Sequence, residues 1–292
     1  MPISVPDDTL RSAAAAHTEP ASRESTMAQD AAVYELPQTI DAWDEHYYKP
    51  IALRHYDRAV RIMLDAMRAK DGQLVLDAGC GTGVHSVRTA KYGCNVRSID
   101  ISNAMLDRAK QNAESAGVAD RITFSQENLT ALTLEDNSVD HAFSWGVVVH
   151  IKDLEAALAH LNRVIRPGGS LALQITNTTA IDHRLEDTAR ALLGKKGPSD
   201  IIDSPFGKGL SWDWNGEEIF TWRMNAATLS RYMRDTFDAQ RTFRGISELT
   251  EFQRWLPGFM STPMLLLNRA AHVLRLPASL AATQLLVFRM PG

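Results

Sequence analysis

The sequence predicts an α/β fold: a Rossmann-like, doubly wound sheet of about seven strands, mostly parallel, with an insertion or lid after the fifth strand. Short apolar runs alternate with stretches whose apolar residues recur at helical spacing. A glycine-rich turn joins the first of these runs to the helix after it. The chain has 292 residues, 45% hydrophobic and 23% charged, which suffices for one large domain or a core domain carrying an insertion.

The first part of the chain predicts a flexible tail followed by a helix. Residues 1–30 mix Ala, Ser, Glu, Pro and Asp without an apolar period, so we expect them to stay unfolded and the domain to span 31–292. From residue 51 the apolar residues recur at helical spacing, and Asp71 and Gly72 end that helix. Its apolar stripe is Tyr56, Val60, Met63, Leu64 and Met67.

Strands and helices then alternate. The apolar runs predict buried strands at 74–78, 95–100, 121–125, 139–145 and 170–176, with helices at 84–92, 103–116 and 154–165 between them. Because crossovers between parallel strands are right-handed, this order places helices on both faces of a parallel sheet. Such sheets bind ligands beyond the carboxyl ends of their strands.

The alternation stops after residue 176. Gly, Pro and Trp become frequent, which predicts an insertion or lid at about 177–224. A helix at 226–234 follows, with Asn225 as its N-cap, and then a strand at 237–243. A mostly helical stretch leads to a final strand at 284–289.

Composition excludes several classes of function. The 31 Lys and Arg against 35 Asp and Glu give a net charge of −4, so we expect no nucleic-acid partner. Two cysteines and no export signal favour a cytoplasmic location, and no apolar run is long enough to span a membrane. Residues 262–292 contain three Arg and no acid, which fits either peripheral membrane contact or a buried helix and strand.

The most informative segment is VLDAGCGTGVHS, residues 75–86. A strand runs into Asp77 and then into three alternate glycines, which let the chain turn tightly and let a ligand approach the backbone. The next strand ends at Asp100, 21 residues beyond Gly79. A carboxylate there can accept both hydroxyl hydrogens of a ribose, so the pattern predicts an adenosine-type ligand.

The glycine spacing separates two nucleotide-binding classes. Dinucleotide sites require G-x-G-x-x-G/A, and the third small residue would be Val84 here. G-x-G-x-G after Asp77 resembles instead the first motif of the class I S-adenosylmethionine-dependent methyltransferases. Segments 95–110, 136–151 and 161–173 resemble three further parts of that family in the expected order, so the resemblance covers about 51–176.

This resemblance implies a cofactor, S-adenosylmethionine, and residues to hold it. Its methionine part would contact Asp77 and the backbone of Gly79, Cys80, Gly81 and Gly83. Its ribose would bind Asp100, and its adenine would lie on Ile101 and Met105, although Met105 also fits a plain core position. Asn128, followed by Leu129, occupies the position where the family often has an acid for the adenine amino group.

Residues 144–147, beginning with Ser144, would face the transferred methyl group. They lack the Asn/Asp-Pro-Pro-aromatic motif of enzymes that methylate base or amide nitrogens. His150 follows them as the candidate general base for a hydroxyl acceptor, with a structural histidine as the alternative. His183 and Asp182 are weaker candidates for the same task.

Aromatic residues gather in two places. Trp212, Trp214, Phe220 and Trp222 lie in the insertion, where they would cover a substrate or simply hold the loop down. Trp43, Tyr47 and Tyr48 lie where related enzymes close over the cofactor.

We therefore expect a methyltransferase without a metal, whose insertion at about 177–224 binds a small-molecule or lipid-linked acceptor. Oxygen is the favoured acceptor atom. The alternatives are N-methylation of a small amine, a nicotinamide-dependent oxidoreductase and a non-catalytic cofactor-binding module. The sequence predicts no oligomeric state.

Overall fold

A computed structural model describes residues 32–41, 50–192, 194, 197–214, 217–251 and 258–292. The predicted tail at 1–30 lies outside them, as do Trp43, Tyr47 and Tyr48. In the described chain one sheet has seven strands in the order β3-β2-β1-β4-β5-β10-β9, and the predicted fold class is confirmed. The strands are β1 (Leu74–Ala78), β2 (Asn95–Asp100), β3 (Ile122–Gln126), β4 (Val139–Trp145), β5 (Ile165–Thr176), β9 (Gln240–Glu248) and β10 (Thr283–Arg289).

The first five strands pair in parallel, and β10 runs antiparallel between β5 and β9. The chain winds outward from β1 to β2 and β3, and then returns to place β4 on the other side of β1. The carboxyl ends of β1 and β4 therefore form the point where the strand order reverses. A ligand crevice is expected at such a point.

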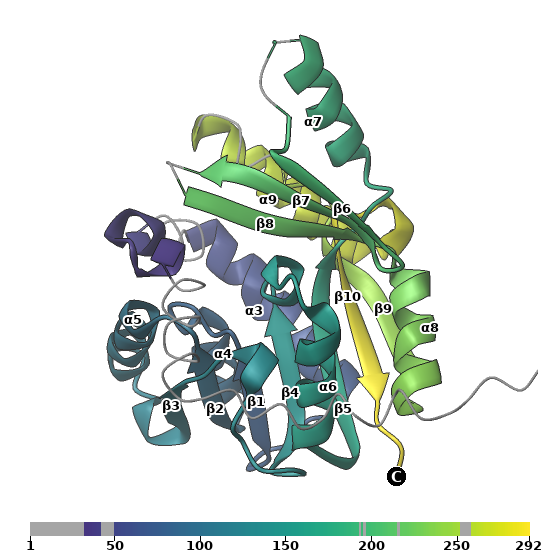
Figure 1. Cartoon of the computed structure of the whole chain (residues 1–292). Coiled ribbons are helices and arrows are strands. Elements are labelled where there is room, and N and C mark those ends of the chain that lie inside the picture. The colour runs from purple at the N-terminus through teal and green to yellow at the C-terminus, as the bar shows by residue number, and fades with distance from the viewer. Residues whose placement is uncertain (1–31, 42–49, 193, 195–196, 215–216, 252–257) are drawn as a thin grey trace, which may run out of the picture.

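Helices cover both faces of the sheet (Figure 1). On one face lie α3 (Pro50–Met67), α4 (Val84–Lys91), α5 (Asn103–Ser115) and α9 (Gly258–Leu274), and on the other lie α6 (Leu154–Val164) and α8 (Ala226–Phe237). Alternate strand residues serve the two faces, since Val75 packs with α3 whereas Leu76 packs with α6. The predicted apolar stripe of α3 is buried along its whole length.

Two boundaries of the sequence prediction are wrong by several residues. The strand expected at 170–176 begins at Ile165, where it already pairs with Val139 of β4, so the Pro-Gly-Gly turn lies within the strand. The strand expected at 237–243 begins only at Gln240, because α8 continues to Phe237 and ends at Asp238 in the left-handed conformation, φ 53°. Phe237 packs against the main core beside Tyr232, with ring centroids 5.8 Å apart, and this contact keeps the last turn helical. Asn225 caps the helix as expected, since its side chain accepts from the amides of Ala227 and Thr228.

The segment after β5 contains regular structure. It folds into α7 (Ile181–Leu192) and an antiparallel sheet of β6 (Asp200–Ser204), β7 (Gly207–Trp214) and β8 (Glu217–Met224). Figure 1 shows this small sheet lying across the carboxyl ends of the central strands. The Thr178 amide donates to Met224 O over 3.0 Å, so β8 is fastened directly to the chain leaving β5.

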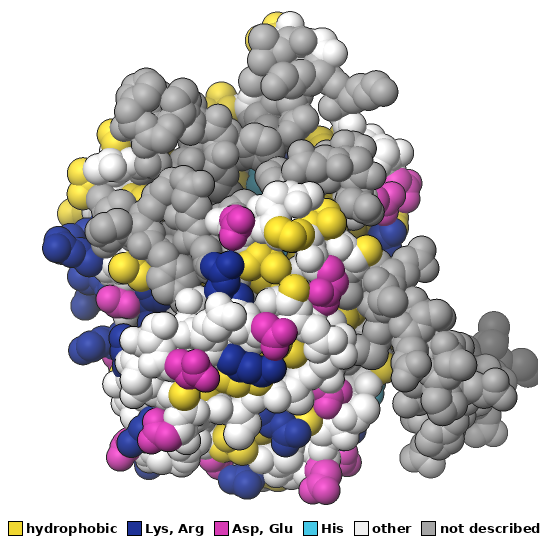
Figure 2. All heavy atoms as spheres, turned by 90° about the vertical axis from the view of Figure 1, so that its left-hand side faces the viewer, with side chains coloured by type: hydrophobic (Ala, Val, Ile, Leu, Met, Phe, Trp, Pro, Cys, Tyr) yellow, Lys and Arg dark blue, Asp and Glu magenta, His cyan; other side chains and the backbone are white. Residues whose placement is uncertain are grey.

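On the face shown in Figure 2, acidic and basic side chains are interspersed over the lower part of the molecule. This mixture is typical of a solvated surface. In the part of the chain that the structure describes, no helix combines the length and apolarity that a membrane span requires.

Candidate functional site

The turn after β1 is folded against the end of β2. The amides of Gly79 and Cys80 both donate to Ile99 O over 2.8 Å. Gly79, Gly81 and Gly83 have φ of 85°, 51° and 78°, a region that residues with a Cβ adopt at a free-energy cost. Helix α4 then begins at Val84, so its first amides point to the same edge of the sheet.

The three glycines have different surroundings. A Cβ on Gly79 would lie 2.5 Å from the Val147 side chain, and one on Gly83 would lie 2.8 Å from Ala109 Cβ. No described atom lies within 4 Å of the position that a Cβ on Gly81 would take. Gly79 and Gly83 are therefore required for packing, whereas Gly81 presents bare backbone to open space at the ligand edge.

Asp100 is hydrogen-bonded to this glycine turn. Its Oδ2 accepts from the Gly81 amide over 2.8 Å and its Oδ1 from the Ser102 amide over 3.0 Å. Burial raises the pKa of the carboxyl group above its usual value. Each carboxylate oxygen keeps a further lone pair, so the two backbone bonds fix the group while it can still accept two hydroxyl hydrogens.

Asp77 is more deeply buried than Asp100. It is 1% exposed, and its Oδ2 accepts from Ser86 Oγ over 2.6 Å. Burial raises the pKa of Asp77 to about 7, so the carboxyl group is partly protonated near neutral pH. A cation placed beside it would stabilise the charged form.

The start of α5 continues the site. Ser102 caps this helix by accepting from the Met105 amide over 3.0 Å, and its own hydroxyl donates to Tyr34 O over 3.1 Å. The short helix η1 (Ala32–Glu35) thus lies beside Asp100. Ile101 is half-buried and Met105 is buried, so both positions are compatible with an apolar wall.

Asn128 and Leu129 serve the local structure. Asn128 Oδ1 accepts from the amide and the hydroxyl of Thr130, both over 2.9 Å, and so begins the short helix η3 (Leu129–Ala131). That oxygen is the atom expected to accept from an adenine amino group, and it already accepts two hydrogen bonds. Leu129 is buried in the main core.

The end of β4 is tied to its neighbours. Ser144 Oγ donates to Ala78 O over 3.0 Å, which joins the ends of β4 and β1. His150 ends the helix η4 (Val148–His150), and its Nδ1 lies 2.7 Å from Phe220 O on β8. Because a carbonyl only accepts, Nδ1 carries a proton in this contact. His150 therefore links the loop after β4 to the insertion.

Two aromatic residues of the insertion pack against the main core and attach the insertion to the central domain. Phe220 and Trp222 are buried in the main core, and Trp222 Nε1 donates to Ile151 O over 2.8 Å. Trp212 is half-buried, and the side chain of Trp214 lies outside the described residues.

His183 and Asp182, the weaker candidates for a general base, lie in α7. Burial lowers the pKa of His183 to about 4, and Asp182 accepts from the Glu251 amide over 2.8 Å.

The comparisons with known proteins agree with this geometry. Residues 76–173, from β1 into β5, match a family model described as a methyltransferase domain. This segment, about a third of the chain, is a methyltransferase domain, and the match supports the predicted resemblance to the class I S-adenosylmethionine-dependent methyltransferase superfamily. A methyltransferase domain supports S-adenosylmethionine as the cofactor and disfavours the nicotinamide-dependent alternative.

Curated relatives match about half of the chain. An O-methyltransferase of Aspergillus nomiae is 31% identical over 132 residues, which is 45% of this chain and 59% of the relative. A sterol 24-C-methyltransferase of Aspergillus fumigatus is 30% identical over 156 residues, covering 52% of this chain and 40% of the relative. The chain thus spans about half the length of these two relatives.

Solved structures share the fold. The magnesium protoporphyrin IX methyltransferase of Synechocystis PCC 6803, solved with bound S-adenosylhomocysteine, has a TM-score of 0.59 at 17% identity, covering 91% of this chain and 99% of that one. The [4+2]-cyclase SpnF has a TM-score of 0.54 at 18% identity, covering 80% of each chain. Because the second protein is named for a different reaction, the fold alone does not decide the chemistry.

The protein also contains a buried polar cluster that the sequence analysis did not predict. Tyr56 Oη donates to Glu248 Oε1 over 2.7 Å, and each residue is 1% exposed. The Tyr56 ring lies 5.6 Å from His85 and 6.4 Å from Trp145, centroid to centroid. Burial lowers the pKa of His85 well below its usual value, so its ring is neutral near pH 7.

The residues of this cluster lie together at the edge of the central sheet where the parallel strands end. His85 lies in the first turn of α4, Trp145 ends β4 and Glu248 ends β9. Tyr56 fits the apolar stripe of α3, so its spacing indicated only a core residue. Glu248 is 192 residues away along the chain, and no local pattern connects the two.

Proposed function

We propose that the protein transfers the methyl group of S-adenosylmethionine to a hydroxyl group of a small or lipid-linked molecule. The observation that carries this proposal is the unit of Gly81 and Asp100 at the point where the strand order reverses. It combines a bare backbone facing open space with a fixed carboxylate, and these are the groups that an adenosine ligand requires. The match to a methyltransferase domain favours the methyl donor as that ligand.

In this proposal the protein positions the reactants and excludes water. The bound cofactor supplies a methyl carbon on a positively charged sulfur, which leaves as a neutral thioether. Asp100 would hold the ribose and Asp77 would face the methionine ammonium group, while the insertion covers the edge of the sheet. Alignment of this kind accounts for about 7–11 kcal/mol of a reaction barrier.

A hydroxyl acceptor must lose its proton as the methyl group arrives, so the site needs a proton acceptor. Two candidates lie near the end of β4. His150 follows it, with Nδ1 already used in the contact with β8. Tyr56 contacts Trp145 and donates to the Glu248 carboxylate, so a proton passed to Tyr56 Oη can be balanced by transfer of the phenol proton to Glu248. We favour Tyr56 and Glu248 because they form a water-excluded pair.

Oxygen is the favoured acceptor atom because an O-methyltransferase is among the relatives and residues 144–147 lack the motif of nitrogen methylation. The sterol 24-C-methyltransferase relative supports carbon as a second candidate. A lipid-linked acceptor is supported by the exposed apolar side chains of Leu185 in α7 and Leu266 and Leu274 in α9.

The test is incubation of the protein with methyl-labelled S-adenosylmethionine and fractionated metabolites, followed by identification of the labelled product. We expect a methyl ether or ester. A labelled amine or a carbon-methylated product would replace the hydroxyl acceptor, and the absence of any labelled product would favour a non-catalytic binding module.

A further inference from the structure

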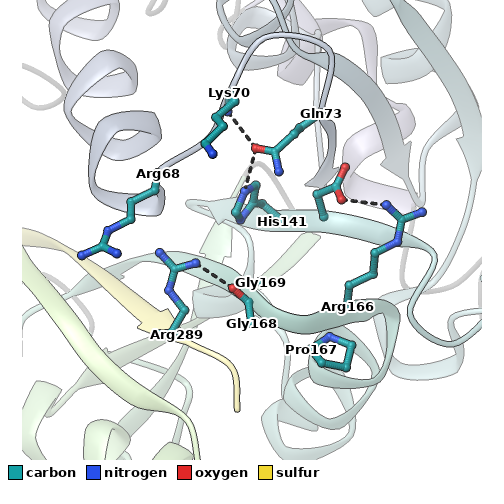
Figure 3. Close-up of a pocket in the computed structure, with 10 residues that line it drawn as sticks. Arg68, Lys70, Gln73, His141, Arg166, Pro167, Gly168, Gly169 and Arg289 are labelled. Atoms are coloured by element: carbon teal, nitrogen blue, oxygen red, sulfur yellow. Dashed lines mark hydrogen bonds and ion pairs between the residues drawn. The ribbon is translucent and has the colours of Figure 1, made fainter. Parts of the chain in front are cut away.

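A hollow lies at the edge of the central sheet where the parallel strands begin, opposite the edge proposed to bind the cofactor. Figure 3 shows the residues that line it. Its volume is about 290 Å³, and four separate segments line it. These are the chain after α3, the start of β4, the Pro-Gly-Gly turn within β5 and the end of β10. The described lining contains four cationic side chains and one carboxylate, namely Arg68, Lys70, Arg166, Arg289 and Asp140. This local excess of positive charge stands out in a chain whose net charge is −4.

Most of this positive charge has no carboxylate partner. Among the described residues, Arg166 pairs with Asp140 over 2.7 Å, whereas no ion pair is formed by Arg68 or Lys70. Arg289 donates to Gly168 O over 2.7 Å and to Met67 O over 3.4 Å, and both partners are neutral carbonyls. The hollow therefore keeps three cationic groups whose charge the described side chains do not neutralise.

Arg68 and Arg289 have unusual local settings. Arg68 follows α3 with φ 60°, a conformation in which glycine is the usual residue, so the chain retains an arginine at a strained position. Arg289 is half-buried, and burial together with the nearby Arg68 charge lowers its pKa. Two guanidinium groups that repel each other across a hollow are stabilised by an anion between them.

His141 forms the neutral floor of the hollow. It is 4% exposed, its Nδ1 accepts from the Ser170 amide over 3.1 Å, and its Nε2 lies 3.2 Å from Gln73 Oε1. Burial lowers its pKa, so it adds no charge near neutral pH. Gly168 has φ 72°, and no described atom lies within 4 Å of the position that its Cβ would take, so the turn is open on that side.

We propose that this hollow binds a small phosphate-type anion, such as pyrophosphate or the phosphate group of a phosphorylated metabolite. Arg68, Lys70 and Arg289 supply its charge recognition. The site is separate from the methyl-transfer site, since its lining comes from the chain before β1 and the start of β4, and not from the carboxyl ends of these strands.

A second basic hollow provides a matched control. It measures about 450 Å³ between α8 and β9 and is lined by Arg231, Arg234 and Arg241. There Arg234 pairs with Asp235 over 2.8 Å, and Arg241 donates to Ser230 Oγ over 2.6 Å. The two hollows share the type of charge, but among the described side chains three cations of the first hollow and two of the second, Arg231 and Arg241, have no carboxylate partner.

The experiment titrates pyrophosphate into the full chain by calorimetry at low ionic strength. Arg68→Asn removes a charge and keeps a residue that tolerates φ above zero, and Lys70→Gln removes a charge from an exposed side chain. We expect each variant to weaken pyrophosphate binding about tenfold, with an unchanged melting temperature and unchanged affinity for S-adenosylhomocysteine. Arg231→Gln is expected to leave pyrophosphate binding unchanged.

The proposal is overturned if the unmodified protein binds no pyrophosphate, or if Arg231→Gln weakens binding as much as Arg68→Asn does. Phosphatidylcholine vesicles containing phosphatidic acid form a second arm. Vesicle binding that is lost in Arg68→Asn and Lys70→Gln would support the site and identify a lipid headgroup as the source of the phosphate.

Discussion

Asp100 combines two tasks, because the carboxylate that would bind a ribose also fixes the glycine turn through the Gly81 amide. Asp100→Ala removes two charge-assisted hydrogen bonds of about 1.5–3 kcal/mol each toward the ligand, so we expect affinity for S-adenosylhomocysteine to fall about tenfold or more. Calorimetry measures this change. Asp100→Asn keeps the size of the side chain and controls for loss of the turn. Unchanged affinity in the alanine variant would contradict the ribose assignment.

Asp77 makes the stability of the ligand-free protein depend on pH in an unusual direction. Its pKa is raised from 3.8 to about 7 in the folded state, so between these values the folded protein binds more protons than the unfolded chain. This group therefore lowers the free energy of unfolding as pH rises from about 4 to 7, and adds no further change above that range.

Asp77→Asn keeps an oxygen for Ser86 and removes the titration. We expect the variant to lose less stability than the unmodified protein between pH 5 and pH 8. Denaturant unfolding at the two pH values gives the comparison. Identical pH dependence in both proteins would show that Asp77 does not titrate in this window.

The buried pair of Tyr56 and Glu248 predicts how methylation responds to substitution. With a hydroxyl acceptor identified, Glu248→Gln should reduce turnover about a hundredfold or more, because it keeps an oxygen for Tyr56 but cannot take a proton. Tyr56→Phe should act similarly, and affinity for S-adenosylhomocysteine should change little in either variant.

His150→Ala is the matched comparison for that pair. It should loosen the contact with Phe220 and lower the melting temperature while most of the turnover remains. Loss of turnover in His150→Ala together with normal turnover in Glu248→Gln would assign the proton to His150 instead.

At the scale of elements, the junction between β1 and α4 separates binding from packing. Gly81→Ala adds a methyl group in open space and costs about 1–2 kcal/mol for its left-handed conformation. Gly83→Ala adds the same strain and also places a Cβ 2.8 Å from Ala109 Cβ. We expect the larger loss of melting temperature in Gly83→Ala and the larger loss of cofactor affinity, relative to stability, in Gly81→Ala. Equal affinity losses would make the turn only a connector.

The predicted elements agree best with the structure where local pattern and burial coincide. The strands at 74–78, 95–100 and 139–145 have the observed bounds because apolar runs bounded by turn residues mark both their ends. The small sheet of the insertion could not be predicted, since its strands depend on pairing with each other and mix polar with apolar residues. The start of β9 was misplaced because Phe237 suits a strand as well as a helix.

The residues of the candidate site also differ in how well the local sequence predicts their position. Asp77, the glycines and Asp100 follow a fixed local spacing, and the sequence alone predicts that they lie together. Glu248 reaches Tyr56 only because β10 inserts between β5 and β9 and carries the end of β9 to α3. No spacing rule contains that information, and a buried tyrosine looks like any other core residue in a helical stripe.

At the scale of the whole molecule, α9 presents an apolar face outward. Leu266, Leu267, Val273 and Leu274 are all exposed, while Leu265 and Asn268 are buried. Arg269 and Arg275 flank these residues, so the face suits an anionic membrane surface. We expect Leu267→Asp with Leu274→Asp to abolish co-sedimentation with phosphatidylglycerol vesicles. Ala119→Asp, an exposed site in η2 (Ala119–Arg121), is the control, and equal binding of all three proteins would exclude this face.

The position of β10 also determines the order in which the sheet is completed. Among the described strands of this sheet it comes last along the chain, yet it lies between β5 and β9, which are synthesised earlier. Until it arrives, both neighbours present unpaired backbone edges, and the closing contacts join residues more than a hundred positions apart, such as Leu171 and Phe288. Long-range pairing of this kind is slow, and open edges are prone to aggregation. Refolding yield, more than final stability, is therefore the property most sensitive to substitutions in β10.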